Sequence, residues 1–148
     1  MSLSIETRVI TWQAALQACQ AAIASAEAQG RHINVAVTDR AGLLMCFLRM
    51  PSAFPQSISI AQEKARTAAG FGFPTAQWMD GIGHSESMKL GFANQPGLII
   101  FGGGLPIYDQ GVLVGGIGVS GASEDEDQRC AQAGLDAIGA AVSANDHN

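Results

Sequence analysis

The spacing of apolar residues along the chain predicts three amphipathic helices. Larger apolar residues recur every three or four positions over residues 11–29, which is typical of a helix with one buried face. A second helix is expected over residues 55–69, where its inner stripe consists of small residues and Gly70 follows as a stop signal. Ser123 and Glu126 form a capping-box sequence, so the third helix is expected to begin there.

Alternating and continuous apolar runs predict five strands. Apolar residues alternate with polar ones over residues 33–37, and a turn beginning at Asp39 leads into a second run over residues 43–48, which indicates a hairpin. The glycine-rich stretch 97–121 holds three further runs, at 98–101, 105–108 and 112–119. Because most connections are tight turns, we expect a single α+β domain over residues 1–148, with a five-stranded, mostly antiparallel sheet.

Composition limits the classes of function. The net charge is −5 and there is no basic cluster, so the sequence offers no electrostatic basis for binding nucleic acid or an anionic membrane. Prolines and glycines interrupt the longest uncharged run, which argues against a spanning helix. The three cysteines lack the spacing of a metal site, so we expect no bound metal and a reducing, cytoplasmic location.

Glycines within the predicted strands mark the candidate ligand site. Residues 102–104 are all glycine, but they lack the Walker spacing and precede a strand, so a turn or bulge is the better interpretation than a phosphate loop. Missing side chains leave room for a ligand against the strands. The predicted wall of the pocket is formed by Gly103, Gly104, Gly116 and Gly118.

Three charged residues are candidates for acid–base or substrate-binding roles. Lys64 is suited to bind an anion or a carbonyl group, although a solvated lysine is the ordinary alternative. Asp39 is a candidate acid or base, with capping of the following turn as the alternative. Arg49 is suited to a substrate carboxylate, with a salt bridge as the alternative.

Two further residues are candidate ligands for a bound group. His84 lies in a glycine-containing stretch that is expected to be an exposed loop. Cys19 lies on the inner face of the first helix, where a free cysteine ordinarily packs as a small apolar residue. No arrangement of serine, histidine and aspartate, or of cysteine and histidine, indicates a nucleophilic enzyme.

Five segments together resemble the GlcG/HbpS-type haem-binding family, which includes the C-terminal domain of PduO-type adenosyltransferases. The segments are VAVTDRAG at 35–42, AQEKARTA at 61–68, FGGGLPI at 101–107, GGIGVSG at 115–121 and the 124–134 stretch that ends CAQAG. Asp39, Lys64 and Ser120 match recurring polar positions of that family, and the turn that ends at Pro106 matches its loop.

The resemblance implies a profilin-like fold, a homo-oligomer and, in some members, haem held by a histidine or cysteine on or near the first helix. Here Cys19 is the residue that the first helix offers. The family resemblance favours a small ligand-binding or haem-sensing protein associated with a catabolic operon. The alternatives are a cofactor-independent enzyme for a small carboxylate or carbonyl compound, using Lys64, Asp39 and Arg49, and an accessory subunit.

Overall fold

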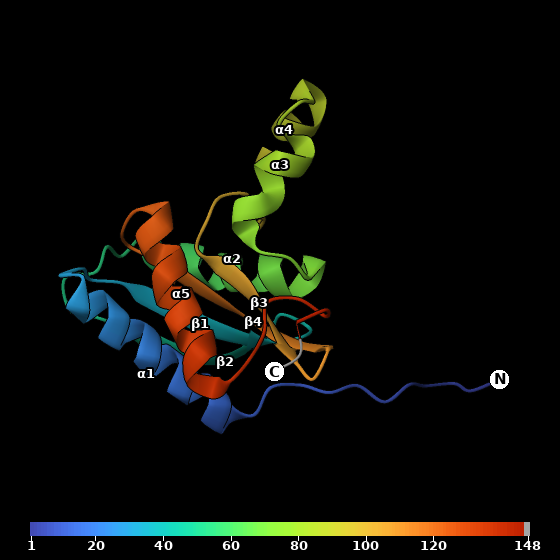
Figure 1. Cartoon of the computed structure of the whole chain (residues 1–148). Helices are drawn as coiled ribbons and strands as arrows, with labels where there is room; N and C mark the ends of the chain where they lie inside the picture. The colour runs from blue at the N-terminus through green and yellow to red at the C-terminus, as the bar shows by residue number, and fades with distance from the viewer. Residues whose placement is uncertain (147–148) are drawn as a thin grey trace.

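A computed structural model describes residues 1–146 as one α+β arrangement (Figure 1). Residues 147–148 of the predicted domain lie outside the described part. The helices are α1 (Trp12–Ala28), α2 (Ser57–Phe71), η1 (Thr75–Gln77), α3 (Trp78–Ile82), α4 (Glu86–Ala93) and α5 (Glu124–Ile138). The strands are β1 (Asn34–Asp39), β2 (Leu44–Arg49), β3 (Gly104–Asp109) and β4 (Val112–Ser120). Within residues 1–146 no helix has the length and apolar character needed to cross a bilayer.

Among residues 1–146 the sheet has four strands, in the order β2-β1-β4-β3, and every neighbouring pair is antiparallel. The prediction of five strands was therefore wrong. The run at 98–101 passes alongside α2 as an irregular segment, and its backbone is held by a side chain: the Ile99 N–H donates to the Thr67 hydroxyl at 3.1 Å. Because this N–H group is already paired with a side chain of α2, it is not available to pair with a neighbouring strand.

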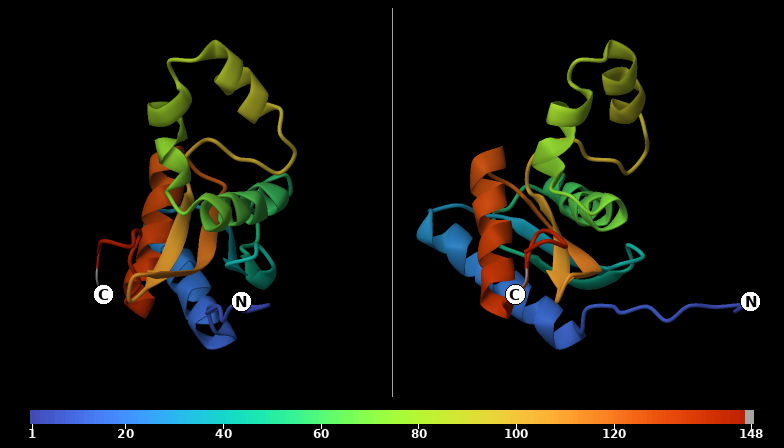
Figure 2. Two further views of the ribbon diagram at one scale, coloured as in Figure 1. Left: turned by 90° about the vertical axis from the view of Figure 1, so that its right-hand side faces the viewer. Right: turned by 45° about the vertical axis from the view of Figure 1, so that its right-hand side comes forward.

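The two faces of the sheet carry side chains of very different size. One face presents large residues such as Val35, Val37, Ile117 and Val119, and α1 and α5 cover it to form the main hydrophobic core. The opposite face presents Ala36, Gly116 and Gly118, and α2 lies on it. Figure 2 shows the resulting three layers, with α2 on one side of the sheet and α1 and α5 on the other.

Capping side chains and a glycine in the left-handed conformation determine where the predicted helices begin and end. The Thr11 hydroxyl caps α1 by accepting from the Ala14 N–H at 3.2 Å, and Ser123 and Glu126 form the full capping box of α5. The second helix continues past Gly70, which was the predicted stop, because Gly72 takes the left-handed conformation at φ 78° and ends it. Helices α3 and α4 form an arm that projects from the three layers (Figure 1), where the sequence predicted an exposed loop around His84.

We predict that Gly118→Ala lowers the free energy of unfolding by about 3 kcal/mol, measured by urea denaturation. A methyl group there would meet the Ala61 carbonyl oxygen and the Ala65 nitrogen, and backbone atoms cannot rotate away. Gly70→Ala is the matched control, because nothing lies within 4 Å of the added carbon and alanine favours a helix. It should leave stability unchanged or raise it by less than about 1 kcal/mol; equal losses in both variants would contradict this account.

Candidate functional site

The strand glycines predicted to line a ligand pocket are covered by α2. Carbons added at Gly116 and Gly118 would collide with the Ala65 and Ala61 carbonyl oxygens, and one added at Gly104 would lie 2.6 Å from the Lys64 carbonyl oxygen. These glycines, together with Pro106 of β3, are buried beneath the helix. The helix backbone therefore occupies the space left by the missing side chains, so these glycines face α2 where an open pocket was expected.

Two of the predicted candidates have local structural roles. Asp39 accepts hydrogen bonds from the Ala41 and Leu43 N–H groups at 2.8 and 3.0 Å, which is the turn-capping alternative. Arg49 donates to the Ala53 carbonyl oxygen at 3.3 Å, at the opposite end of the β1–β2 hairpin. The structure therefore does not bring Asp39 and Arg49 together.

The two candidate ligands of a bound group are also separated. Cys19 has no exposed surface and packs in the core between α1 and the sheet, where burial raises the pKa of its thiol. His84 lies exposed in the turn between α3 and α4. A haem group could not reach Cys19 without disrupting the core.

Lys64 lies inside the protein, contrary to the solvated lysine that was the ordinary expectation. Its side chain is 1% exposed, and its Nζ donates to the Val119 carbonyl oxygen at 2.8 Å and to a carboxylate oxygen of Asp127 at 3.2 Å. The Phe101 ring lies over the same nitrogen, with its centroid 5.1 Å away. Gly103 makes room for this arrangement, since a carbon added there would lie 2.5 Å from Nζ.

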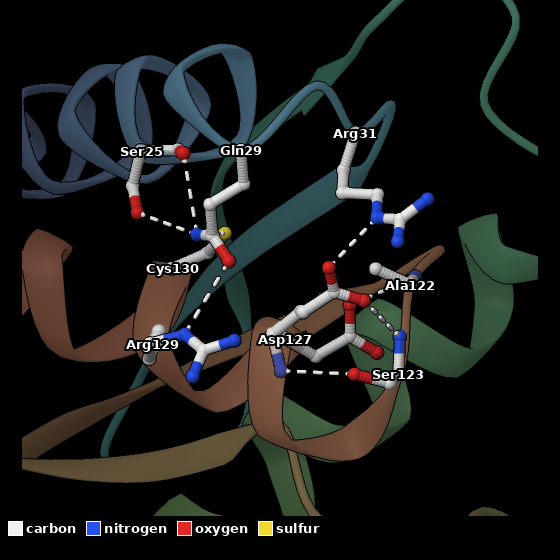
Figure 3. A network of polar contacts seen from close by, with 9 residues as sticks. Ser25, Gln29, Arg31, Ala122, Ser123, Asp127, Arg129 and Cys130 are labelled. Atoms are coloured by element: carbon white, nitrogen blue, oxygen red, sulfur yellow. Dashed lines mark hydrogen bonds and ion pairs between the residues drawn. The ribbon is translucent and has the colours of Figure 1, made fainter.

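Asp127 joins the lysine to the start of α5. Its second carboxylate oxygen accepts from the Ala122 N–H at 3.0 Å, in the segment that links β4 to the helix. Figure 3 shows this first turn of α5 with Arg31, from the segment after α1, close to it. The Arg31 Nε donates a hydrogen bond to Glu126 at 2.7 Å. The hydrogen bond from Arg31, with those from Ser123, lowers the pKa of Glu126 to about 2.

Burial disfavours the charged forms of both Lys64 and Asp127, which together form the inner pair. It lowers the pKa of Lys64 and raises the pKa of Asp127, while each charge favours the ionised form of the other. The sequence gives only indirect signals of this pair: Asp127 follows Glu126 of the capping box, and Lys64 precedes Ala65 of the small-residue stripe. Asp127 was not among the candidate site residues predicted from the sequence.

A groove of about 610 Å³ lies between α2 and the arm. Its walls are mainly apolar. Phe71 ends α2, Phe92 lies on α4, and both contact the buried Trp78 ring at 4.7 and 5.0 Å between centroids. The other lining residues are Arg66, Thr67, Met88, Gly91, Gln95, Pro96, Gly97 and Leu98. The sequence did not reveal this groove, because it depends on where the chain places α4 and the segment 95–98 relative to α2.

Comparison with known proteins identifies relatives along nearly the whole chain. The family described as "Haem degrading protein HbpS-like" matches residues 10–136. An uncharacterised 15.0 kDa protein from the dhaT–dhaS intergenic region of Citrobacter freundii is 35% identical, with 92% of this chain and 96% of that protein covered.

Two solved structures share the fold. Protein ORFY of Klebsiella pneumoniae superposes with a TM-score of 0.87 at 33% identity, covering 94% of this chain and 97% of that one. A PduOC complex with haem has a TM-score of 0.84 at 28% identity, covering 91% of this chain and 99% of that one.

We predict that the Lys64–Asp127 pair stabilises the fold only as a pair. Lys64→Met or Asp127→Leu alone should lower the free energy of unfolding by about 3–5 kcal/mol, because each leaves an unpaired buried charge. The double variant should lose less than the sum of the two, measured by urea denaturation.

Lys89→Met is the matched control, since Lys89 pairs with the exposed Glu86 on α4 and its loss should cost less than about 1 kcal/mol. Strict additivity of the two inner substitutions would show that the charges do not depend on each other.

Proposed function

The chain belongs to the HbpS-like family, and on that premise we propose that it is a ligand-binding protein that holds haem in the groove between α2 and α4. The observation that carries the proposal is the groove itself, about 610 Å³ in volume and walled by apolar side chains. Sites for small molecules and cofactors are typically apolar clefts of this size with a few polar groups. A relative of the same fold has been solved as a complex with haem.

The residues of the groove fit the chemistry of haem. Phe71, Phe92 and Leu98 supply apolar surface for the macrocycle. Arg66, exposed on α2, supplies a positive charge for a propionate group. Met88 supplies a thioether, which is an axial ligand of haem iron in other proteins, and its side chain is 43% exposed. When bound, the haem would supply a redox-active iron whose potential depends on that ligand.

Met88 replaces the iron ligands that were predicted from the sequence. Cys19 is sealed in the core, and His84 does not line the groove. The glycine wall at 103–118 is covered by α2, so it contributes no surface to a flat ligand. The proposal therefore keeps haem as the ligand and moves its site from the sheet to the outer side of α2.

The enzyme alternative with three charged residues is less well supported. Asp39, the last residue of β1, pairs with Gly115, whereas Lys64 contacts Val119, four residues further along β4. Asp39 is also occupied by two backbone N–H groups. It is therefore not placed to act as acid or base beside Lys64.

Homo-oligomerisation and association with a catabolic operon stay predictions. The arm exposes Met79 and Leu90 in addition to Met88 of the groove, and exposed apolar side chains of this kind are common at protein interfaces. Sedimentation velocity with and without haemin would show whether a second copy competes with haem for the groove.

We predict that titration with haemin gives a saturable Soret shift that depends on Met88. Met88→Leu keeps the apolar volume but removes the sulfur, so affinity should fall at least about tenfold with a changed Soret position. Met79→Leu is the control, since Met79 is similarly exposed on α3 but lies outside the groove. Similar spectra and affinities for the two variants would exclude Met88 as the ligand.

We predict a smaller effect from the charge at the edge of the groove. Arg66→Gln should weaken haemin binding about two- to fivefold, because an exposed ion pair contributes less than about 1 kcal/mol. Cys19→Ala and His84→Ala should leave the Soret band unchanged. Loss of the band in either of these two variants, with the fold intact by circular dichroism, would return the site to the positions predicted from the sequence.

A further inference from the structure

A second, smaller cavity lies over the N-terminal half of α2, away from the lining of the apolar groove. Its volume is about 180 Å³, and Lys64 and Asp127 are part of its lining. Ser57, at the start of α2, and Ser120, at the end of β4, add two hydroxyl groups. The partly exposed Phe54 and Phe101 and the carboxylate of Glu124 complete its rim.

We propose that this cavity is a carbonyl site, in which the Lys64 amine forms a reversible imine with a small neutral aldehyde. The chemistry needs an amine that can lose a proton, a nearby group to accept it, and donors for the carbonyl oxygen. Lys64 supplies the amine, and Asp127 lies 3.2 Å from Nζ. Neither Ser57 nor Ser120 has a side-chain hydrogen bond to another described residue, so both hydroxyls are free to bind the oxygen.

Charge and volume select the ligand class. Lys64 is balanced by Asp127, and Glu124 adds a second carboxylate that accepts from the Gly102 N–H at 2.7 Å. The lining therefore carries a net negative charge, which disfavours carboxylates and phosphates. A volume of 180 Å³ corresponds to about six water molecules, so the cavity admits only compounds of a few heavy atoms.

The atoms of the reaction balance without any redox partner. The Lys64 ammonium gives a proton to Asp127, and the free amine attacks the carbonyl carbon while the oxygen takes up that proton. Asp127 then passes a second proton from Nζ to the same oxygen, which leaves as water, and a protonated imine remains on Nζ. Burial, which lowers the pKa of Lys64, raises the fraction of neutral amine that can attack.

The chain provides its own control, because its second lysine, Lys89, is partly exposed on α4. Native protein would be treated with limiting acetaldehyde and sodium cyanoborohydride, which reduces an imine to a stable ethyl group. Peptide mapping by mass spectrometry then measures the modification of each lysine over time. We expect Lys64 to react about ten times faster than Lys89, because Asp127 lies beside its amine to accept the proton and two hydroxyl groups can bind the carbonyl oxygen.

Three outcomes separate a reactive lysine from a structural one. Modification of Lys64 that is no faster than that of Lys89 in native protein overturns the proposal, as does modification of Lys64 only in urea. Asp127→Asn keeps the shape of the side chain and removes the proton acceptor, so it should abolish the preference for Lys64 while circular dichroism shows an intact fold. A preference that survives in this variant overturns the role of Asp127.

Discussion

The close contact between α2 and the sheet is the constraint on which the rest of the structure depends. Gly116 and Gly118 on β4 face Ala61 and Ala65 on the helix, and no larger side chain fits between the two backbones. Close packing of this kind leaves no void for a solvent or ligand molecule. It also carries Lys64 to the end of β4, where its amine meets the Val119 carbonyl group. The buried charge is a consequence of the short distance between helix and strand.

Features governed by neighbouring residues could be predicted from the sequence, and those governed by distant contacts could not. The β1–β2 hairpin, the Asp39 turn and the Ser123 capping box depend on a few consecutive residues, and all three are present. The run at 98–101 has strand composition, but the Thr67 side chain holds it. The burial of Lys64 depends on Asp127, sixty-three positions away. The family could be predicted because its motifs are local in sequence.

The two hollows along α2 differ because different surroundings meet the helix. Its C-terminal half faces the arm, whose aromatic side chains produce an apolar groove. Its N-terminal half faces the ends of β4 and α5, where backbone groups and charged side chains converge. The segment at 98–101 contributes Leu98 to the first hollow and Phe101 to the second. One helix can therefore present two chemically distinct surfaces, while the sheet beneath it stays the same.

The projecting arm gives the fold a region that can change independently in evolution. It leaves the body after α2 and returns before β3, so its α4 helix contributes no buried residue to the core. Insertions, deletions and substitutions in such a segment leave the sheet and its packing unaltered. Descendants of a common ancestor could therefore acquire new ligand preferences by altering the arm alone, without passing through an unstable intermediate.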